Sequence, residues 1–198
     1  MEGISTLPRD APPAPLCYGR LMQRLFVALR PLPLVRSWLL GLMGGVRGAR
    51  WQRDDQLHLT LRFIGEVDRH MARDVDAALA AIRHPPFEVT LATLGLFDRR
   101  GRPEALWIGA RPREPLAALH RKIDQALVGC GLAPERRAYL PHVTLARFGR
   151  ESGPLGPFME EQGGATSPPF SADAFLLFES RLGADGSAYV ELARYALG

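Results

Sequence analysis

The octapeptide His58-Leu-Thr-Leu-Arg-Phe-Ile-Gly65 returns later in the chain as His142-Val-Thr-Leu-Ala-Arg-Phe-Gly149. Aligned without gaps, the two copies share His, Thr, Leu and Gly at the same places. If the copies lie on two strands related by a pseudo-twofold axis, they bring two imidazoles and two hydroxyls to one cleft. Imidazole titrates near neutral pH, so two facing imidazoles can serve as a general acid and a general base.

Strand periodicity predicts which side chains of each copy face that cleft. With a period of two, His58, Thr60 and Arg62 share one face, and the apolar residues between them share the other. In the second copy, His142 and Thr144 share a face by the same rule. Arg147 falls on the opposite side by simple alternation, so either a bulge or the strand end redirects it, or it points away from the cleft.

The pattern of apolar residues predicts an α+β fold. Strand, helix and motif strand occur in that order twice, which indicates a two-lobed pseudo-symmetric fold with antiparallel sheets lining a central cleft and helices outside. The expected strands are 25–29, 57–64, 87–97, 105–110, 142–148, 174–178 and 189–195; the expected helices are 34–42, 68–82 (capped by Asp68) and 115–128. Residues 150–169, rich in Gly, Pro and Ser, are predicted to form a loop that is functional or disordered.

Composition bounds the class of protein. Of the 198 residues, 46% are hydrophobic, which is enough for a buried core, so we expect a flexible Pro-rich tail at 1–19 and one bilobal domain at 20–198. No stretch reaches the roughly 20 apolar residues that span a bilayer, and the N-terminus does not resemble a signal peptide. Cys17 and Cys130 are solitary, so neither a disulfide framework nor a Cys-pair zinc site is indicated. These features predict a cytoplasmic protein.

The net charge of +4 comes almost entirely from arginine, because Lys122 is the only lysine among 25 basic residues. The planar guanidinium group binds phosphate in a bidentate manner, so the composition permits a nucleic-acid substrate. Genomic base composition could produce the same bias, and the charge therefore does not establish the substrate.

Around the two motifs, the chain resembles the RNA 2′,3′-cyclic phosphodiesterases, also called 2′-5′ RNA ligases, within the two-histidine phosphoesterases. The likeness covers about residues 20–198. It includes an opening strand, Arg-Leu-Phe-Val-Ala-Leu (24–29), the first motif block with Trp51 before it (49–66), the second block with Tyr139 before it (139–147), and a closing hairpin (175–181 with 189–192). The tail and residues 150–169 do not match clearly.

The resemblance implies hydrolysis of RNA 2′,3′-cyclic phosphate ends to 2′-phosphates, without a metal ion or another cofactor. It implies that His58 donates a proton to the departing 3′-oxygen and that His142 accepts one from water, although the pseudo-symmetry allows the reverse. Thr60 and Thr144 would donate to the non-bridging oxygens, and Arg147 would assist phosphate binding unless it forms a surface or inter-lobe salt bridge. Trp51 and Tyr139 could stack on a base or pack in the core. The family also favours a monomer without an obligate protein partner.

Three alternatives remain at this level. The chain could be a non-catalytic module that binds a nucleotide or an RNA end. It could instead run the reverse 2′-5′ ligation or act on small cyclic nucleotides. A metallohydrolase is disfavoured, because no His-Glu-x-x-His motif and no acidic cluster lies near either motif. His70, His84 and His120 lie outside the repeated motif, and we expect structural roles for them.

Overall fold

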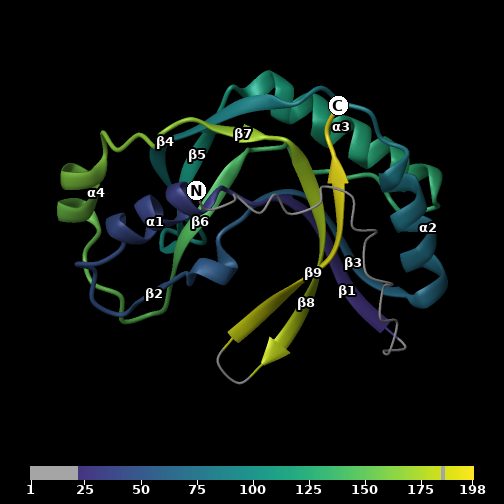
Figure 1. The fold of residues 1–198 in the computed structure, drawn as a ribbon. Helices are drawn as coiled ribbons and strands as arrows, with labels where there is room; N and C mark the ends of the chain where they lie inside the picture. Colours follow the sequence, from purple (N-terminus) through teal and green to yellow (C-terminus); the bar gives the residue numbers. More distant parts are fainter. Residues whose placement is uncertain (1–21, 184–185) are drawn as a thin grey trace, which may run out of the picture.

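A computed structural model describes residues 22–183 and 186–198; the predicted tail at 1–19 lies outside the described residues. The chain forms one strongly curved antiparallel sheet that arches over an open concave side, with helices on its outer surface (Figure 1). The α+β class and the antiparallel sheet around a central concavity are confirmed.

The sheet runs in the order β7-β4-β5-β6-β3-β1-β8-β9, and β2 pairs with β6 off this path. Its two central strands, β6 and β3, carry the two motifs, and the pair Leu59 and Val143 joins them. The strands are β1 (Met22–Leu29), β2 (Ala49–Trp51), β3 (Leu59–Asp68), β4 (Phe87–Asp98), β5 (Pro103–Arg111), β6 (His142–Phe148), β7 (Phe170–Ala172), β8 (Ala174–Gly183) and β9 (Gly186–Ala196).

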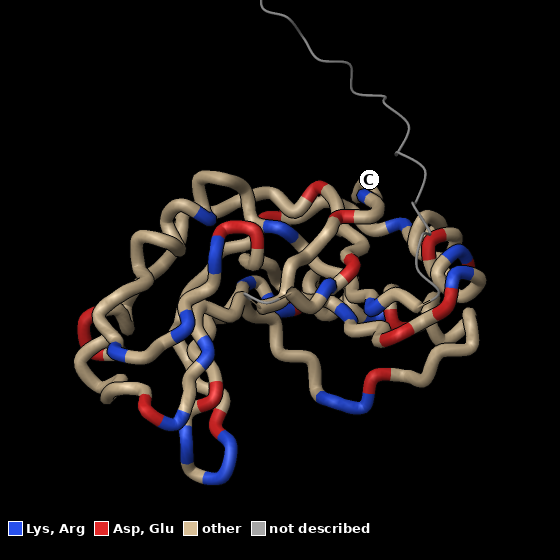
Figure 2. The backbone as a smooth tube through the Cα atoms, turned by 90° about the horizontal axis from the view of Figure 1, so that it is seen from below, with Lys and Arg blue, Asp and Glu red and all other residues tan. Residues whose placement is uncertain are grey.

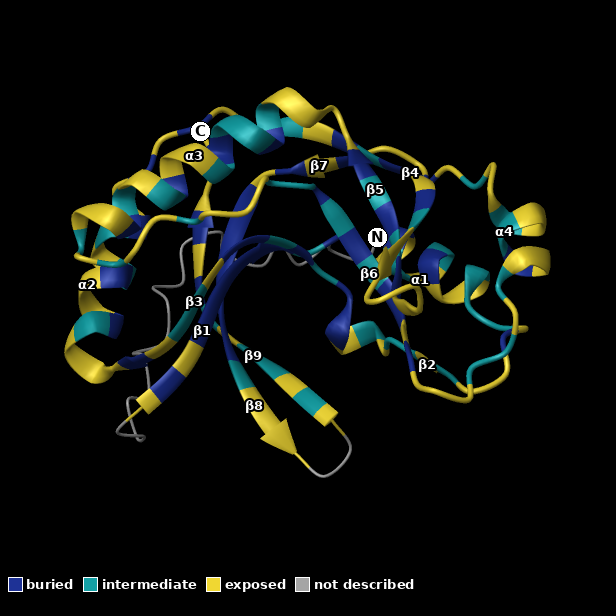
Figure 3. Cartoon of the chain, turned by 180° about the vertical axis from the view of Figure 1, so that it is seen from behind, coloured by how far each residue is buried: buried dark blue, intermediate teal, exposed yellow. Residues whose placement is uncertain are grey.

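The helices are α1 (Pro33–Leu42), α2 (Arg69–Ala80), α3 (Arg113–Gly129) and α4 (Gly156–Gln162), with a 3₁₀ turn, η1, at Asp54–Gln56. The predicted cap of α2 is confirmed, because the Asp68 carboxylate accepts from the backbone N–H groups of His70 and Met71, each at 2.9 Å. In Figure 3 the outward faces of α2 and α3 are exposed, whereas β1 beneath them is largely buried. None of the described helices is long and apolar enough to cross a membrane.

The segment 150–169 is not a continuous loop, and that prediction was wrong in part. It contains α4, whose Phe158 is buried and lies against Trp51 with ring centroids 5.5 Å apart. The short strands β2 and β7 were also not predicted. Each has only three residues, which is too short for a recognisable alternation of apolar and polar side chains. They form through pairing with distant strands, β2 with β6 and β7 with β4.

Two hydrophobic clusters lie on the two sides of the sheet. The main core fills the space between the convex face and the helices, and Val27, Leu59 and Val143 belong to it. A smaller cluster forms on the concave side from Phe26, Ala28, Leu176 and Phe178, with Tyr189 packed against it. Residues of β1 thus alternate between the two clusters, as the strand period requires.

The same β-bulge occurs in both motif strands. On β3, Thr60 pairs with Ala28 and Arg62 with Val27, so Leu61 is the extra residue. On β6, Thr144 pairs with Trp107 and Ala146 with Leu106, so Leu145 is the extra residue. A bulge shifts the alternation by one position. The residue after each leucine therefore turns into the core, and the following one turns to the concave side.

This bulge corrects the prediction that Arg62 shares a face with His58 and Thr60. Arg62 is buried on the helix side, where its Nε donates to Asp124 Oδ1 of α3 at 2.7 Å. Its Nη groups donate to the carbonyl oxygens of Phe63 and Ala133, and Glu135 lies 3.7 Å away. Burial opposes ionisation of Asp124, but the hydrogen bonds from Arg62 and from the Glu135 backbone hold the pKa of Asp124 below its ordinary value. Arg62 therefore anchors β3 to α3 and to the segment that leads into β6.

We expect Arg62→Met to lower the free energy of unfolding by about 2–3 kcal/mol, because it leaves Asp124 without its cationic partner. The loss is below that of a fully buried pair since Asp124 retains some exposure to solvent. Urea unfolding measures it, with Arg121→Met as the control, because the Arg121–Glu114 pair of α3 is exposed. The control should change by less than about 0.5 kcal/mol. Equal losses in the two variants would contradict an anchoring role.

Candidate active site

Both motif histidines are held by the same backbone contact. Nδ1 of His58 lies 2.7 Å from the Gln56 carbonyl oxygen, and Nδ1 of His142 lies 2.7 Å from that of Leu140, two residues upstream in each case. A carbonyl oxygen can only accept, so Nδ1 carries the proton in each ring. Nε2 of each imidazole is therefore the nitrogen left to exchange a proton with a bound molecule.

Aromatic rings from outer strands surround each imidazole. The centroids of Phe26 and Tyr189 lie 4.9 and 5.0 Å from that of His58, and those of Phe97 and Trp107 lie 5.0 and 5.9 Å from that of His142. Beside His142, Gly95 leaves space for the Trp107 indole, because a Cβ atom at position 95 would lie 2.1 Å from that ring. The sequence alone did not predict these rings as part of the site, since only strand register reveals that they flank the histidines.

Burial among these rings governs the ionisation of both histidines. It lowers the pKa of His58 to about 4; the Gln56 carbonyl opposes this, and the charges of His142, Arg147 and Arg30 add to it. Burial also lowers the pKa of His142, again opposed by a carbonyl and assisted by Arg147. The two imidazoles and Arg147 thus lie within electrostatic reach of one another. Both rings are neutral at pH 7 in the empty site, and a bound anion would favour protonation.

Thr60 and Thr144 lie on the concave side with the histidines. Continuing the Leu59–Val143 register by one residue in each direction sets His58 opposite Thr144 and Thr60 opposite His142. The four side chains therefore form a compact group with the histidines on one diagonal and the threonines on the other. No hydrogen bond within the described residues engages either threonine hydroxyl. Both hydroxyls are available to a ligand.

The bulge at Leu145 resolves the position of Arg147. It turns Arg147 to the side of His142 and Thr144, and the Arg147 charge lowers the pKa of both histidines. Arg147 is exposed and takes part in no ion pair within the described part of the chain. In the first repeat the same place is held by Phe63, which is 61% exposed. The four motif side chains on the concave side thus have a guanidinium beyond one end of the group and an exposed aromatic ring beyond the other.

The two aromatic residues that could have contacted a base instead pack within the fold. Tyr139 stacks on His120 at 4.2 Å between centroids, and Trp51 lies against Phe158. His84 is buried with Nδ1 2.7 Å from the Pro85 carbonyl oxygen, and His70 is exposed on α2. These histidines lie outside the motif group, as predicted.

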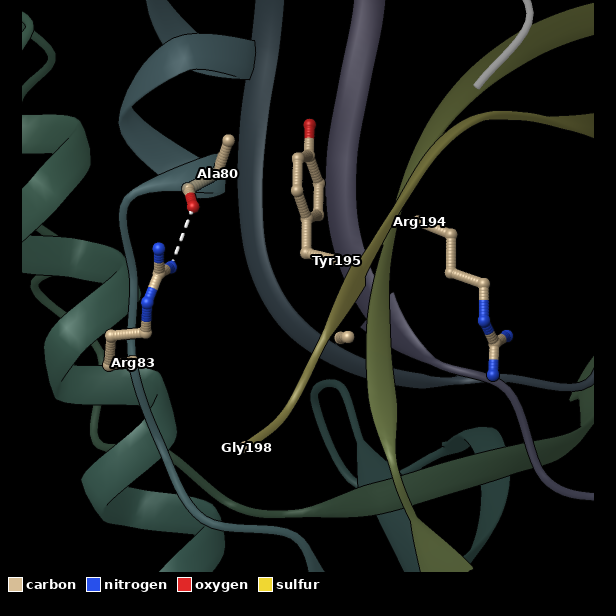
Figure 4. A pocket seen from close by; sticks show the side chains of 6 residues that line it. Ala80, Arg83, Arg194, Tyr195 and Gly198 are labelled. Atoms are coloured by element: carbon tan, nitrogen blue, oxygen red, sulfur yellow. Dashed lines mark hydrogen bonds between the residues drawn. The ribbon is translucent and has the colours of Figure 1, made fainter. Parts of the chain in front are cut away.

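Two surface pockets lie away from the motif residues. One, of about 370 Å³, lies near the C-terminus and is lined by Ala80, Arg83, Arg194, Tyr195, Ala196 and Gly198 (Figure 4). The other, of about 480 Å³, is lined by Thr90 and residues 111–113. Within residues 22–183 and 186–198, no three His, Cys, Asp or Glu side chains gather as a potential metal site. The histidine pair is the best-formed chemical site in the described structure.

Comparison with known proteins identifies the family to which these paired motifs belong. Residues 46–175 match the family model described as the 2′-5′ RNA ligase superfamily. The chain belongs to this superfamily. The resemblance seen in the sequence is confirmed, and the matched region contains both His-x-Thr strands.

Two relatives and one solved structure are similar to this chain over most of their length. The RNA 2′,3′-cyclic phosphodiesterase of Aeropyrum pernix is 33% identical over 142 residues, covering 70% of this chain and 81% of that protein. The enzyme of the same name from Archaeoglobus fulgidus is 25% identical over 172 residues, covering 85% and 97%. Among solved structures, E. coli LigT complexed with 3′-AMP has a TM-score of 0.69 at 26% identity, covering 89% of this chain and 98% of LigT.

Proposed function

We propose that this chain hydrolyses the 2′,3′-cyclic phosphate at an RNA end to a 2′-phosphate. The observation that carries the proposal is the pair of imidazoles on adjacent strands, each oriented by its own backbone carbonyl with Nε2 left free. Relatives named RNA 2′,3′-cyclic phosphodiesterases support the choice of substrate.

In-line displacement at phosphorus requires a base and an acid on opposite sides of the phosphate. We assign His142 as the acceptor of the proton from water and His58 as the donor to the 3′-oxygen. The oxygen of water bonds to phosphorus as the bond from phosphorus to the 3′-oxygen breaks. Because the empty site keeps both rings neutral, the phosphate anion itself promotes the protonation that catalysis requires.

The remaining cleft residues bind and orient the substrate. The Thr60 and Thr144 hydroxyls donate to the non-bridging oxygens, where negative charge increases in the transition state. Arg147, beyond Thr144 on β6, supplies a cation on one side of the phosphate. On the other side, beyond Thr60 on β3, the exposed ring of Phe63 offers a surface on which a base can stack.

The proposed mechanism uses only these side chains, so no metal ion or other cofactor is needed. If an RNA 5′-hydroxyl replaces water as the nucleophile, the same displacement forms a 2′-5′ linkage: the 5′-oxygen bonds to phosphorus as the bond from phosphorus to the 3′-oxygen breaks. We expect hydrolysis to dominate in dilute solution, because water is in large excess. Small nucleoside 2′,3′-cyclic phosphates fit the same chemistry. We further propose that the protein acts as a cytoplasmic monomer, and sedimentation at assay concentration tests the oligomeric state.

A short RNA with a 2′,3′-cyclic phosphate end tests the activity. The RNA is incubated with the protein in EDTA, and the position of the product phosphate is mapped. A 2′-phosphate is expected. Loss of activity in EDTA that added metal restores would contradict the metal-free mechanism. RNA that is bound but not converted, with or without metal, would favour a non-catalytic binding module.

The pH dependence of kcat/KM follows from the lowered pKa values. The active free enzyme has one imidazole protonated and the other neutral. Both pKa values lie below 6.5, that of His58 at about 4, so the optimum of kcat/KM should lie below pH 6.5. Above that pH, kcat/KM should fall, because the one imidazole that still carries a second proton loses it. The optimum of kcat should be more alkaline, because bound phosphate raises both pKa values. A kcat/KM profile flat through neutral pH would contradict the paired imidazoles.

A further inference from the structure

Arg30 lies beside His58 on the concave side of the sheet. Along β1, Phe26 and Ala28 belong to the concave cluster, and the strand period places Arg30 next in the same row. Leu29 pairs with Leu59, so the register continued by one residue sets Arg30 opposite His58. The Arg30 charge is among the causes that lower the pKa of His58, which places the guanidinium within electrostatic reach of the imidazole.

The Arg30 side chain has an unused hydrogen-bond donor. Its Nε is buried and has no partner in the described structure, which is rare for a buried polar atom. Its Nη2 lies 3.8 Å from Asp54 Oδ2, too far for a hydrogen bond. Asp54 instead accepts from Arg36 Nε at 2.8 Å through its other oxygen, and Arg36 also donates to the Pro31 carbonyl at 2.8 Å. Two guanidinium groups share one carboxylate, and only Arg36 is fully engaged.

The second repeat indicates that the scaffold does not need an arginine at this place. On β5 the residue opposite His142 is Gly109, which has no side chain to offer. The two halves of the site therefore differ: a guanidinium group lies beside His58, and no side chain lies at the matching position beside His142. Arg30 lies in line with His58 and Thr144 across the strands, and Arg147 lies further along β6 from Thr144. Both guanidinium groups thus stand at the end of the cleft away from Phe63.

Basic and acidic positions are interleaved along much of the described backbone (Figure 2). Two arginines at one end of a cleft lined by histidines and threonines form a local cationic site. Guanidinium groups bind phosphate oxygens through charge-assisted hydrogen bonds.

We propose that Arg30 is a second phosphate-binding residue, which donates to a non-bridging oxygen of the cyclic phosphate from the wall opposite Arg147. This assignment rests on the proposed function for the identity of the phosphate. It adds a specific contact on the side of His58, and it explains why a buried donor is left without a partner in the protein.

Arg30→Gln tests the proposal, with Arg36→Gln as the matched control because both arginines contact Asp54. Inorganic phosphate is the first probe, and its Kd is measured by calorimetry. We expect Arg30→Gln to weaken phosphate binding by about 10- to 100-fold, the range for a charge-assisted hydrogen bond, and Arg36→Gln to change it by less than about threefold. Unchanged phosphate binding in Arg30→Gln, or an equal loss in both variants, would overturn the proposal.

The second probe is turnover of adenosine 2′,3′-cyclic phosphate and of a dinucleotide with the same cyclic end. If Arg30 contacts the cyclic phosphate, Arg30→Gln should lower kcat/KM by the same factor on both substrates. A loss confined to the dinucleotide would overturn the assignment, since the arginine would then contact the phosphodiester between the nucleotides. If wild type binds phosphate but hydrolyses neither substrate, the proposed function fails, and phosphate affinity alone still decides the role of Arg30.

Discussion

His58→Ala and His142→Ala are each expected to lower kcat/KM by about two to four orders of magnitude on an RNA 2′,3′-cyclic phosphate, because each removes one proton-transfer group. The loss should fall mainly on kcat, since the threonines and Arg147 still bind the phosphate. Far-UV circular dichroism and urea unfolding monitor the fold of each variant. The exposed His70→Ala provides a control with the same chemical change on α2 and should retain wild-type activity.

A substrate with sulfur in place of the 3′-oxygen separates the two roles. A thiol has an ordinary pKa near 8.5, far below that of an alcohol, so the thiolate leaves without prior protonation. The defect of His58→Ala should then shrink to about tenfold or less, whereas that of His142→Ala should persist, because water must still lose its proton. The opposite pattern would reverse the assignment. A variant that keeps most of its activity on the oxygen substrate would exclude the two-histidine mechanism itself.

The neighbourhood of the histidines shows what a repeat in the sequence can predict. Two His-x-Thr copies, each preceded by its own strand and helix, were enough to predict that the two motif strands present their polar groups to one cleft. The structure adds that the two strands pair directly with each other at the centre of the sheet. Alternation then placed His58, Thr60, His142 and Thr144 on one face, as observed. Alternation gave the wrong face for Arg62 and Arg147, because the β-bulges at Leu61 (against β1) and Leu145 (against β5) shift the residues that follow them. A bulge depends on pairing with the neighbouring strand, which the motif strand alone does not reveal.

Other features of the site depend on contacts between distant parts of the chain. Phe26, Tyr189 and Phe97 reach the histidines from β1, β9 and β4, and Arg30 is set opposite His58 only by strand register. The helix α4 lies in a segment of low helix propensity, yet Phe158 finds a partner in Trp51. A local sequence pattern cannot predict such contacts, because their energy comes from tertiary packing.

Thr60→Val and Thr144→Val are expected to lower kcat by about 100- to 1000-fold each, with little change in KM. Valine matches the shape of threonine but cannot donate a hydrogen bond, so it removes stabilisation where charge builds on the non-bridging oxygens. Thr60→Ser and Thr144→Ser keep the hydroxyl and should retain activity within about tenfold of wild type. Steady-state kinetics on adenosine 2′,3′-cyclic phosphate measures all four variants.

The split between kcat and KM distinguishes the roles that a threonine on a strand can have. If the valine variants raise KM and leave kcat unchanged, the hydroxyls bind the substrate and its transition state equally well. If serine is as damaging as valine, the methyl group matters and the residues contribute by packing. Because the pseudo-twofold axis relates Thr60 to Thr144, comparable losses at both positions are expected when each hydroxyl contacts one non-bridging oxygen. A loss at one position alone would mean that the phosphate lies to one side of the axis.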